Sequence, residues 1–148
     1  MIVVRGCAFR PDRHYHVAHN VWVQALGNGE VLLGATSFGV ALAGEFVSFR
    51  PKPAGTRVLV NGSVGLIELW KTMVSVRSPL AGELVEGNDA AAKNPALINK
   101  DPYGTGWLVR LRVADWAAAA QGLVTGAAIG AAFEEAMRLE NFDGPEKQ

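Results

Sequence analysis

The chain has 148 residues and a formal net charge of zero, with 14 basic and 14 acidic side chains. This length is typical of one compact domain with its own hydrophobic core, so we predict a single domain over residues 1–148. The basic residues are scattered along the chain, which argues against nucleic acid as a partner. The single cysteine, Cys7, excludes an internal disulfide framework. It fits a reducing compartment, and we expect a cytoplasmic protein.

Two stretches of the chain bear on membrane association. The N-terminal residues 1–7 lack an apolar run of signal-peptide length. Residues 117–133 are mostly small and apolar, but glutamine, threonine and three glycines interrupt them. These interruptions disfavour a membrane-spanning helix, so we expect no membrane partner.

Short segments rich in β-forming residues, separated by turn residues, fill the first half of the chain. They predict strands over residues 21–26, 31–36, 45–50 and 58–60, divided by glycine- and proline-containing turns. Residues 37–44 instead predict a short helix, with Ser37 as its N-cap and Gly44 just past its end.

The second half begins with two strands and then becomes helical. Residues 64–69 and 73–77 are predicted strands on either side of Trp70 and Lys71, a pair without the residues of a standard tight turn. The other expected elements are a helix starting at residues 94–98, a half-buried strand over 107–113, helices from 115 to about 139 with a break at Gly122 and a new N-cap at Thr125, and a polar tail over 141–148.

The number and spacing of these strands indicate the fold class. Many short strands at close intervals, with helices only as additions, are typical of a small antiparallel sandwich or barrel. We therefore predict a mainly β protein.

Two long motifs resemble a known family. Residues 67–84, I-E-L-W-K-T-M-V-S-V-R-S-P-L-A-G-E-L, resemble the lipoylation hairpin of glycine-cleavage H proteins, V-E-S-V-K-A-V-S-D-L-Y-S-P-V-S-G-E-V, and the family's lysine falls on Lys71. Residues 94–108 are similar to that family's N-P-E-L-V-N-x-D-P-Y-G-x-G-W-L. Upstream, Tyr15, His19 and Trp22 resemble its Y-x-x-x-H-E-W segment, and residues 33–36 its I-G-I-T.

The resemblance implies a fold, a cofactor and a role. The fold is the lipoyl-domain barrel-sandwich hybrid, in which two small antiparallel sheets with short helices form a core over about residues 11–113, followed by a C-terminal helical extension over about 114–140. Lys71 would carry covalent lipoate at a hairpin tip, flanked by Glu68, Trp70 and Thr72. Glu68 would help a lipoate-attaching enzyme recognise the hairpin. The protein would be a monomeric carrier without catalytic residues of its own.

Two departures from the family pattern bear on the pathway. In the family's H-E-W segment a single acidic residue separates the histidine from the tryptophan. Here two residues, Asn20 and Val21, separate His19 from Trp22, and neither is acidic. The aspartate of K-A-x-S-D is replaced by Ser75. Without these carboxylates, a cationic amine carried on the lipoyl arm of Lys71 loses charge-assisted hydrogen bonds. The altered hairpin, the Arg5-Gly6-Cys7 head and the alanine-rich tail resemble the lipoate-binding proteins of heterodisulfide-reductase-like sulfur oxidation.

Several alternatives stay open at this point. The chain could instead carry an aminomethyl group between glycine cleavage enzymes, or it could be an interaction module with an unmodified Lys71 and with Trp70 as a partner contact. Biotin is disfavoured because its lysine usually lies between two methionines. No metal site is expected, because His14, His16 and His19 lack acidic or cysteine ligands at suitable spacing. We expect Cys7 to be inert rather than a redox partner of the arm.

Overall fold

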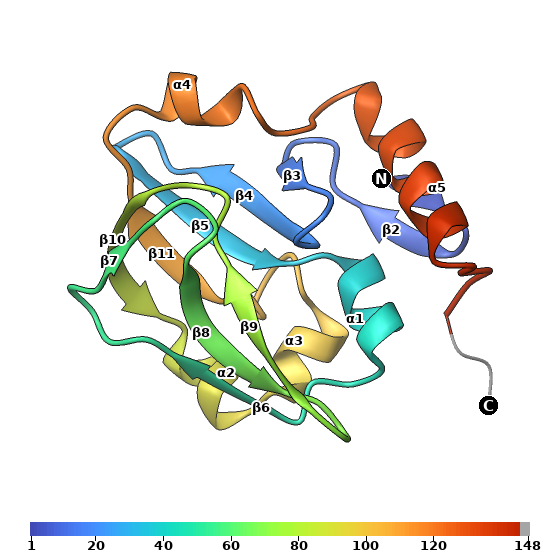
Figure 1. The fold of residues 1–148 in the computed structure, drawn as a ribbon, viewed down its shortest axis with the longest axis horizontal. Coiled ribbons are helices and arrows are strands. Elements are labelled where there is room, and N and C mark those ends of the chain that lie inside the picture. The colour runs from blue at the N-terminus through green and yellow to red at the C-terminus, as the bar shows by residue number, and fades with distance from the viewer. Residues whose placement is uncertain (146–148) are drawn as a thin grey trace.

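The computed structural model describes residues 1–145, which form three antiparallel sheets flanked by short helices (Figure 1). The strands are β1 (Ile2–Val4), β2 (Cys7–Phe9), β3 (His14–His16), β4 (Val21–Ala25), β5 (Glu30–Ala35), β6 (Ser48–Pro51), β7 (Arg57–Val58), β8 (Ser63–Glu68), β9 (Met73–Arg77), β10 (Gly82–Gly87) and β11 (Val109–Arg112). The helices are α1 (Ser37–Ala43), α2 (Asp89–Lys93), α3 (Ala96–Lys100), α4 (Trp116–Ala120) and α5 (Ala128–Leu139).

Two of the sheets pack face to face around a first core. The larger sheet has the strand order β3-β4-β5-β11-β10-β7, and the smaller one has the order β6-β8-β9. Alternate residues of both sheets point inward. The core that they form includes Val21, Val23 and Leu33 from the larger sheet and Phe49 and Ile67 from the smaller one. The fold is mainly β, as predicted.

A second core lies on the other face of the larger sheet. Side chains alternate along β4, so Trp22 points away from Val21 and Val23, and all three are at most 2% exposed. Gly34 stands opposite Trp22 in the register, and a Cβ atom there would come within 2.5 Å of the indole ring. The absence of a side chain on Gly34 therefore makes room for Trp22.

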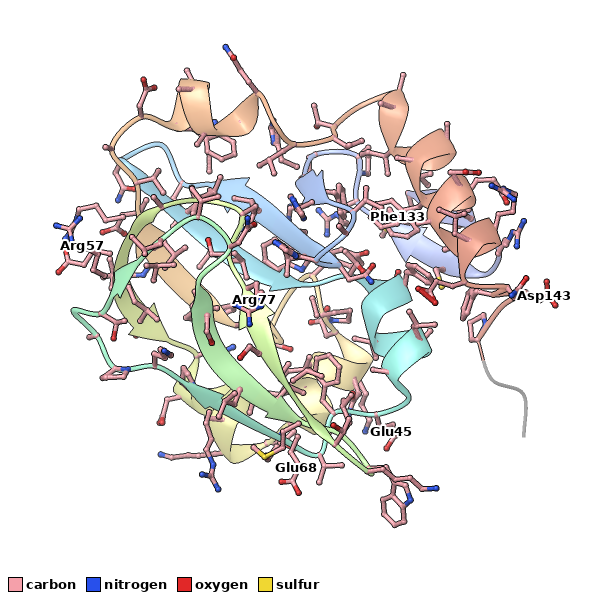
Figure 2. All side chains as sticks on the ribbon, in the orientation of Figure 1. Glu45, Arg57, Glu68, Arg77, Phe133 and Asp143 are labelled. Atoms are coloured by element: carbon pink, nitrogen blue, oxygen red, sulfur yellow. The ribbon has the colours of Figure 1, made fainter. Side chains whose placement is uncertain are left out.

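The chain termini complete this second core. The β1–β2 hairpin and α5 lie side by side on one side of the molecule (Figure 1). Residues one helical turn apart on α5, namely Ile129, Phe133 and Met137, are fully buried. Figure 2 shows Phe133 on the side of α5 that faces the strands, and its ring stacks on Phe9 at a centroid distance of 4.2 Å. Helix α5 of the predicted C-terminal helical extension thus forms part of this core.

Several predicted helix boundaries were wrong in detail. The N-cap of α1 is Thr36, not Ser37, because the Thr36 hydroxyl accepts a hydrogen bond from the Gly39 amide at 2.9 Å. Gly44 follows the helix as expected, with a φ of 90°. Thr125 does not cap α5: its hydroxyl donates to the backbone carbonyl of Arg13, and the helix begins three residues later.

The sequence patterns also missed strands and misjudged the tail. Strands β1, β2, β3 and β10 and helix α2 were not predicted. The polar-tail prediction for residues 141–148 is wrong at Phe142, which is 9% exposed and packs edge-on against Phe38 at 5.0 Å; residues 146–148 lie outside the described residues. Over residues 1–145 no helix is long and apolar enough to cross a membrane. Neither the single-domain prediction nor its internal limits were tested, and both stay predictions.

Candidate functional site

Lys71 lies at the tip of the β8–β9 hairpin, which projects from the small sheet (Figure 1). The two strands pair from Ser63 opposite Arg77 to Glu68 opposite Met73. The Leu69 amide then donates to the Thr72 carbonyl at 2.7 Å, which leaves Trp70 and Lys71 as the two turn residues. Leu69 packs against the first core. This contact anchors the turn, so the exposed Lys71 amine is presented on a rigid support.

The other residues predicted for the site surround this turn. The Glu68 carboxylate accepts a hydrogen bond from the Ser48 hydroxyl at 3.0 Å, and Figure 2 shows Glu68 near the hairpin tip. Thr72 closes the turn through its carbonyl group. The Trp70 indole is 85% exposed, the highest value among the large apolar side chains of the described chain. Glu68, Trp70 and Thr72 therefore lie beside Lys71, and their roles stay predictions.

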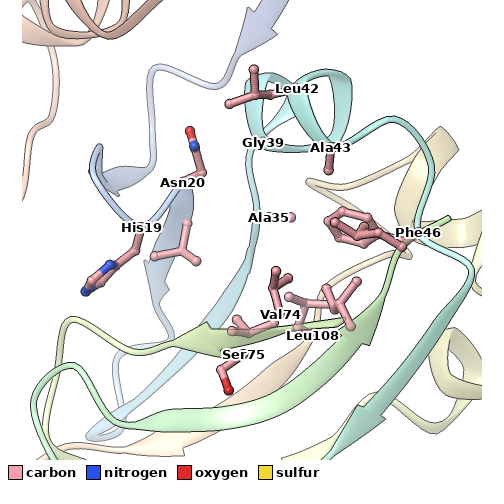
Figure 3. A pocket seen from close by; sticks show the side chains of 14 residues that line it. His19, Asn20, Ala35, Gly39, Leu42, Ala43, Phe46, Val74, Ser75 and Leu108 are labelled. Atoms are coloured by element: carbon pink, nitrogen blue, oxygen red, sulfur yellow. The ribbon is translucent and has the colours of Figure 1, made fainter. Parts of the chain in front are cut away.

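An apolar cavity of about 240 Å³ opens between the two sheets next to the hairpin (Figure 3). Leu69 and Val74, which lie on either side of Lys71 in the sequence, both line it. None of its lining residues is acidic, and His19 is the one that can ionise. The cavity is lined by His19, Asn20, Val21, Ala35, Gly39, Leu42, Ala43, Phe46, Ile67, Leu69, Val74, Ser75, Val76 and Leu108.

The polar side chains of this cavity point away from its centre. The Asn20 amide oxygen accepts a hydrogen bond from the Thr36 hydroxyl at 3.3 Å, and the backbone of Asn20 is left-handed with a φ of 55°. The Ser75 hydroxyl is directed away from the cavity, on the opposite side of β9 from Val74 (Figure 3). Ser75 pairs with the exposed Leu66. A carboxylate at position 75 would therefore lie on the outer face of the hairpin, whereas one at Val21 would enter the cavity.

The three histidines lie on the β3–β4 side of the molecule. The His16 and His19 rings stack at a centroid distance of 4.0 Å, and His16 Nδ1 accepts a hydrogen bond from the His19 amide. His19 Nε2 also lies 2.7 Å from the Asn61 side-chain oxygen, on the loop before β8. His14 packs edge-on against Trp116. Among residues 1–145, no group of three or more histidine, cysteine or acidic side chains is placed to hold a metal ion.

Cys7 lies on β2 within the second core. It is 3% exposed, and burial raises the pKa of its thiol above the usual value. A high pKa reduces the thiolate fraction, which is the reactive form. This environment gives no support to a redox role for Cys7.

Similar proteins identify the family to which this chain belongs. A model of the "Glycine cleavage H-protein" family matches residues 13–136. Two similar proteins are "Glycine cleavage system H protein 2" of Aquifex aeolicus (strain VF5), 38% identical over 82% of this chain and 76% of that protein, and "Glycine cleavage system H protein" of Chlorobaculum parvum (strain DSM 263 / NCIMB 8327), 35% identical over 84% and 98%.

A solved structure agrees with these sequence matches. The glycine cleavage system H protein from Mycobacterium marinum superimposes with a TM-score of 0.71 and 32% identity, covering 86% of this chain and 99% of that one. The chain belongs to the glycine cleavage H-protein family. The family prediction is confirmed, whereas the finer resemblance to sulfur-oxidation proteins finds no support in these comparisons.

Proposed function

We propose that this protein is a lipoyl carrier in which the Lys71 amine forms an amide with lipoate. The observation that supports this most directly is the placement of Lys71 on an exposed two-residue turn that is anchored to the core through Leu69. Among the described residues, the Lys71 ammonium has no ion-pair partner within 4.0 Å. A carrier needs such a free amine on a rigid support, because the arm must reach other enzymes.

The cavity beside the hairpin fits the apolar part of a lipoyl group. Ser75 lies four residues along the chain from Lys71, or about 13 Å at ~3.3 Å per strand residue. An extended lysyl-lipoyl arm can cover this length. Val21, Phe46 and Leu108 would then contact the hydrocarbon chain and the dithiolane ring. When bound, lipoate supplies a disulfide that nucleophiles or two electrons can open.

Two pathways compete for this carrier. Family membership and the names of the relatives favour the glycine cleavage system, with an aminomethyl group as cargo and the glycine cleavage enzymes as partners. The apolar cavity favours an uncharged or sulfur-containing cargo, because its lining offers no carboxylate to a cationic amine. The second candidate is therefore sulfur transfer to a heterodisulfide-reductase-like complex. In either case we propose a cytoplasmic monomer that needs partner enzymes for turnover.

The attachment site can be tested by intact mass. The protein should gain the mass of one lipoyl group when it is produced with lipoate, and Lys71→Arg should gain none, because arginine keeps the charge but cannot form this amide. Lys52→Arg is a matched control on another exposed lysine and should be modified normally. Modification of Lys71→Arg would show that lipoate is attached to another residue. If neither the wild-type protein nor Lys71→Arg is modified, the result favours the interaction module.

The pathway can be tested by reconstituting glycine cleavage with purified enzymes. At equal lipoylation, we expect this protein to support at least tenfold less activity than an authentic H protein, because a lost charge-assisted hydrogen bond removes about 1.5–3 kcal/mol and each ~1.4 kcal/mol is a factor of ten. Val21→Glu should raise the activity, whereas Ser75→Asp should not, since position 75 faces outward. Activity equal to that of the authentic protein would establish glycine cleavage and reject sulfur transfer.

A further inference from the structure

Trp70 has an environment that the fold does not explain. It is 85% exposed, while Trp22 is fully buried, and its indole N–H donates to no group among residues 1–145. An indole normally buries most of its surface and satisfies its N–H. The Leu69–Thr72 hydrogen bond defines the turn, so the backbone of Trp70 has a fixed position relative to the sheet. The exposed indole therefore offers an apolar contact at the hairpin tip.

The neighbouring surface adds to this apolar contact. Met73 on β9 is 49% exposed and Leu66 on β8 is 39% exposed, and both lie on the outer face of the hairpin together with Ser75. Tryptophan is one of the side chains that are enriched in binding hot spots. The hairpin tip thus combines the Lys71 amine with an exposed apolar side chain directly beside it.

We propose that Trp70 is a recognition residue for the enzyme that attaches lipoate to Lys71. This inference rests on the proposed function, because it requires Lys71 to be the modified residue. The Cα atoms of adjacent residues are about 3.8 Å apart. An enzyme that takes the Lys71 amine into its active site must therefore cover Trp70 as well. Enzymes that act on the far end of the finished arm are separated from the turn by the length of that arm.

The reaction itself sets how close the two proteins must come. The neutral Lys71 amine forms a C–N bond with the carboxyl carbon of an activated lipoyl donor, a mixed anhydride or a thioester. The bond from that carbon to the leaving group breaks, and the amine gives up one proton to a base. Nothing is oxidised or reduced. Because the amine itself must reach the donor, the hairpin tip enters the enzyme and the indole is desolvated against it.

The test is the attachment reaction with purified lipoate-attaching enzyme and unmodified carrier, followed by intact mass. Trp70→Ala should raise KM at least tenfold, equivalent to about 1.4 kcal/mol, with kcat changed less than twofold. Trp70→Phe should recover most of the loss, because it keeps an apolar ring. Leu139→Ala is the matched control, since Leu139 is 67% exposed but lies on α5.

A binding measurement separates recognition from a structural effect. The fluorescence of the unmodified protein should shift to shorter wavelength when the attaching enzyme is added, and Trp70→Phe should lose that shift. An unchanged KM in Trp70→Ala would overturn the proposal, as would a loss confined to kcat. Slower reaction of fully lipoylated Trp70→Ala with downstream enzymes would also overturn it. These results leave the carrier function standing, whereas failure of the wild-type protein to gain lipoate at Lys71 would reject that function.

Discussion

The two faces of the six-stranded sheet differ in what they bury. On one face, the sheet packs against the β6-β8-β9 sheet and leaves an apolar cavity beside Lys71. On the other face, Trp22, Phe9 and the buried stripe of α5 pack without leaving large aromatic side chains exposed. Strand β4 contributes to both faces through Val21 and Trp22.

The proposed binding cavity lies on the first face, whereas buried aromatic side chains dominate the second. A cavity forfeits packing contacts, and a protein tolerates that loss where an occupant can fill the space. In the second core, Phe133 contacts the rings of Phe9, Tyr15 and Phe38. Substitutions on the two faces should therefore affect different properties.

The largest expected effect on stability is in the second core. Phe133→Ala removes a fully buried ring and should lower the free energy of unfolding by about 3–5 kcal/mol. Urea denaturation gives this value, and lipoylation of Lys71 below the unfolding transition should be unchanged. The control Leu139→Ala, on the same helix but exposed, should change stability by less than about 0.5 kcal/mol. A loss below about 1 kcal/mol in Phe133→Ala would show that α5 contributes little.

A smaller effect should distinguish the inside of the cavity from its outer wall. Val21→Glu places a carboxyl group among apolar side chains and should cost about 1–3 kcal/mol, because its polar atoms lack partners there. Ser75→Asp should change the free energy of unfolding by less than about 0.5 kcal/mol, since its side chain faces outward. Urea denaturation of both variants measures the difference. Equal losses would mean that position 75 also faces the cavity.

The first core and the hairpin were predictable from the sequence. Alternating side chains around Val74 and Val76 and the long motifs on either side of Lys71 indicated the strands and the turn. The second core was not predictable in this way, because β1, β2 and β3 have three residues each. Such strands are too short for a periodic pattern to stand out. Phe142 appeared to belong to a polar tail since its packing partner, Phe38, is distant in the sequence.

The cavity could be predicted only in part. The sequence showed which positions lack carboxylates, but not which way their side chains point. The extra residue between His19 and Trp22 is accommodated by the left-handed backbone of Asn20, a conformation that asparagine tolerates. That backbone turns the Asn20 amide toward Thr36, so Val21 becomes the cavity-facing residue. Hydrogen bonds between distant segments decide such orientations.

The smallest expected effect is a pH dependence at the edge of the cavity. Burial, together with the charge of His19, lowers the pKa of His16 below its usual value, and burial also lowers the pKa of His14. In the unfolded chain these groups bind protons near pH ~6.5. The unfolded state therefore gains more protons as the pH falls through this value, and folding stability should decrease. The stability should be complete above pH ~6.5 and should level off below the folded-state pKa values.

His16→Asn separates the contribution of His16 from that of His14. The asparagine side-chain oxygen can accept the hydrogen bond that His16 Nδ1 accepts from the His19 amide, but it does not titrate in this range. Urea midpoints measured one unit above and one unit below pH ~6.5 should differ less in His16→Asn than in the wild-type protein. His14→Gln, the matched variant, removes the other titrating group, and the double variant should show the least pH dependence. If His16→Asn keeps the full wild-type dependence while His14→Gln removes it, protonation at His14 alone destabilises the fold, and the cavity edge at His16 and His19 is insensitive to pH.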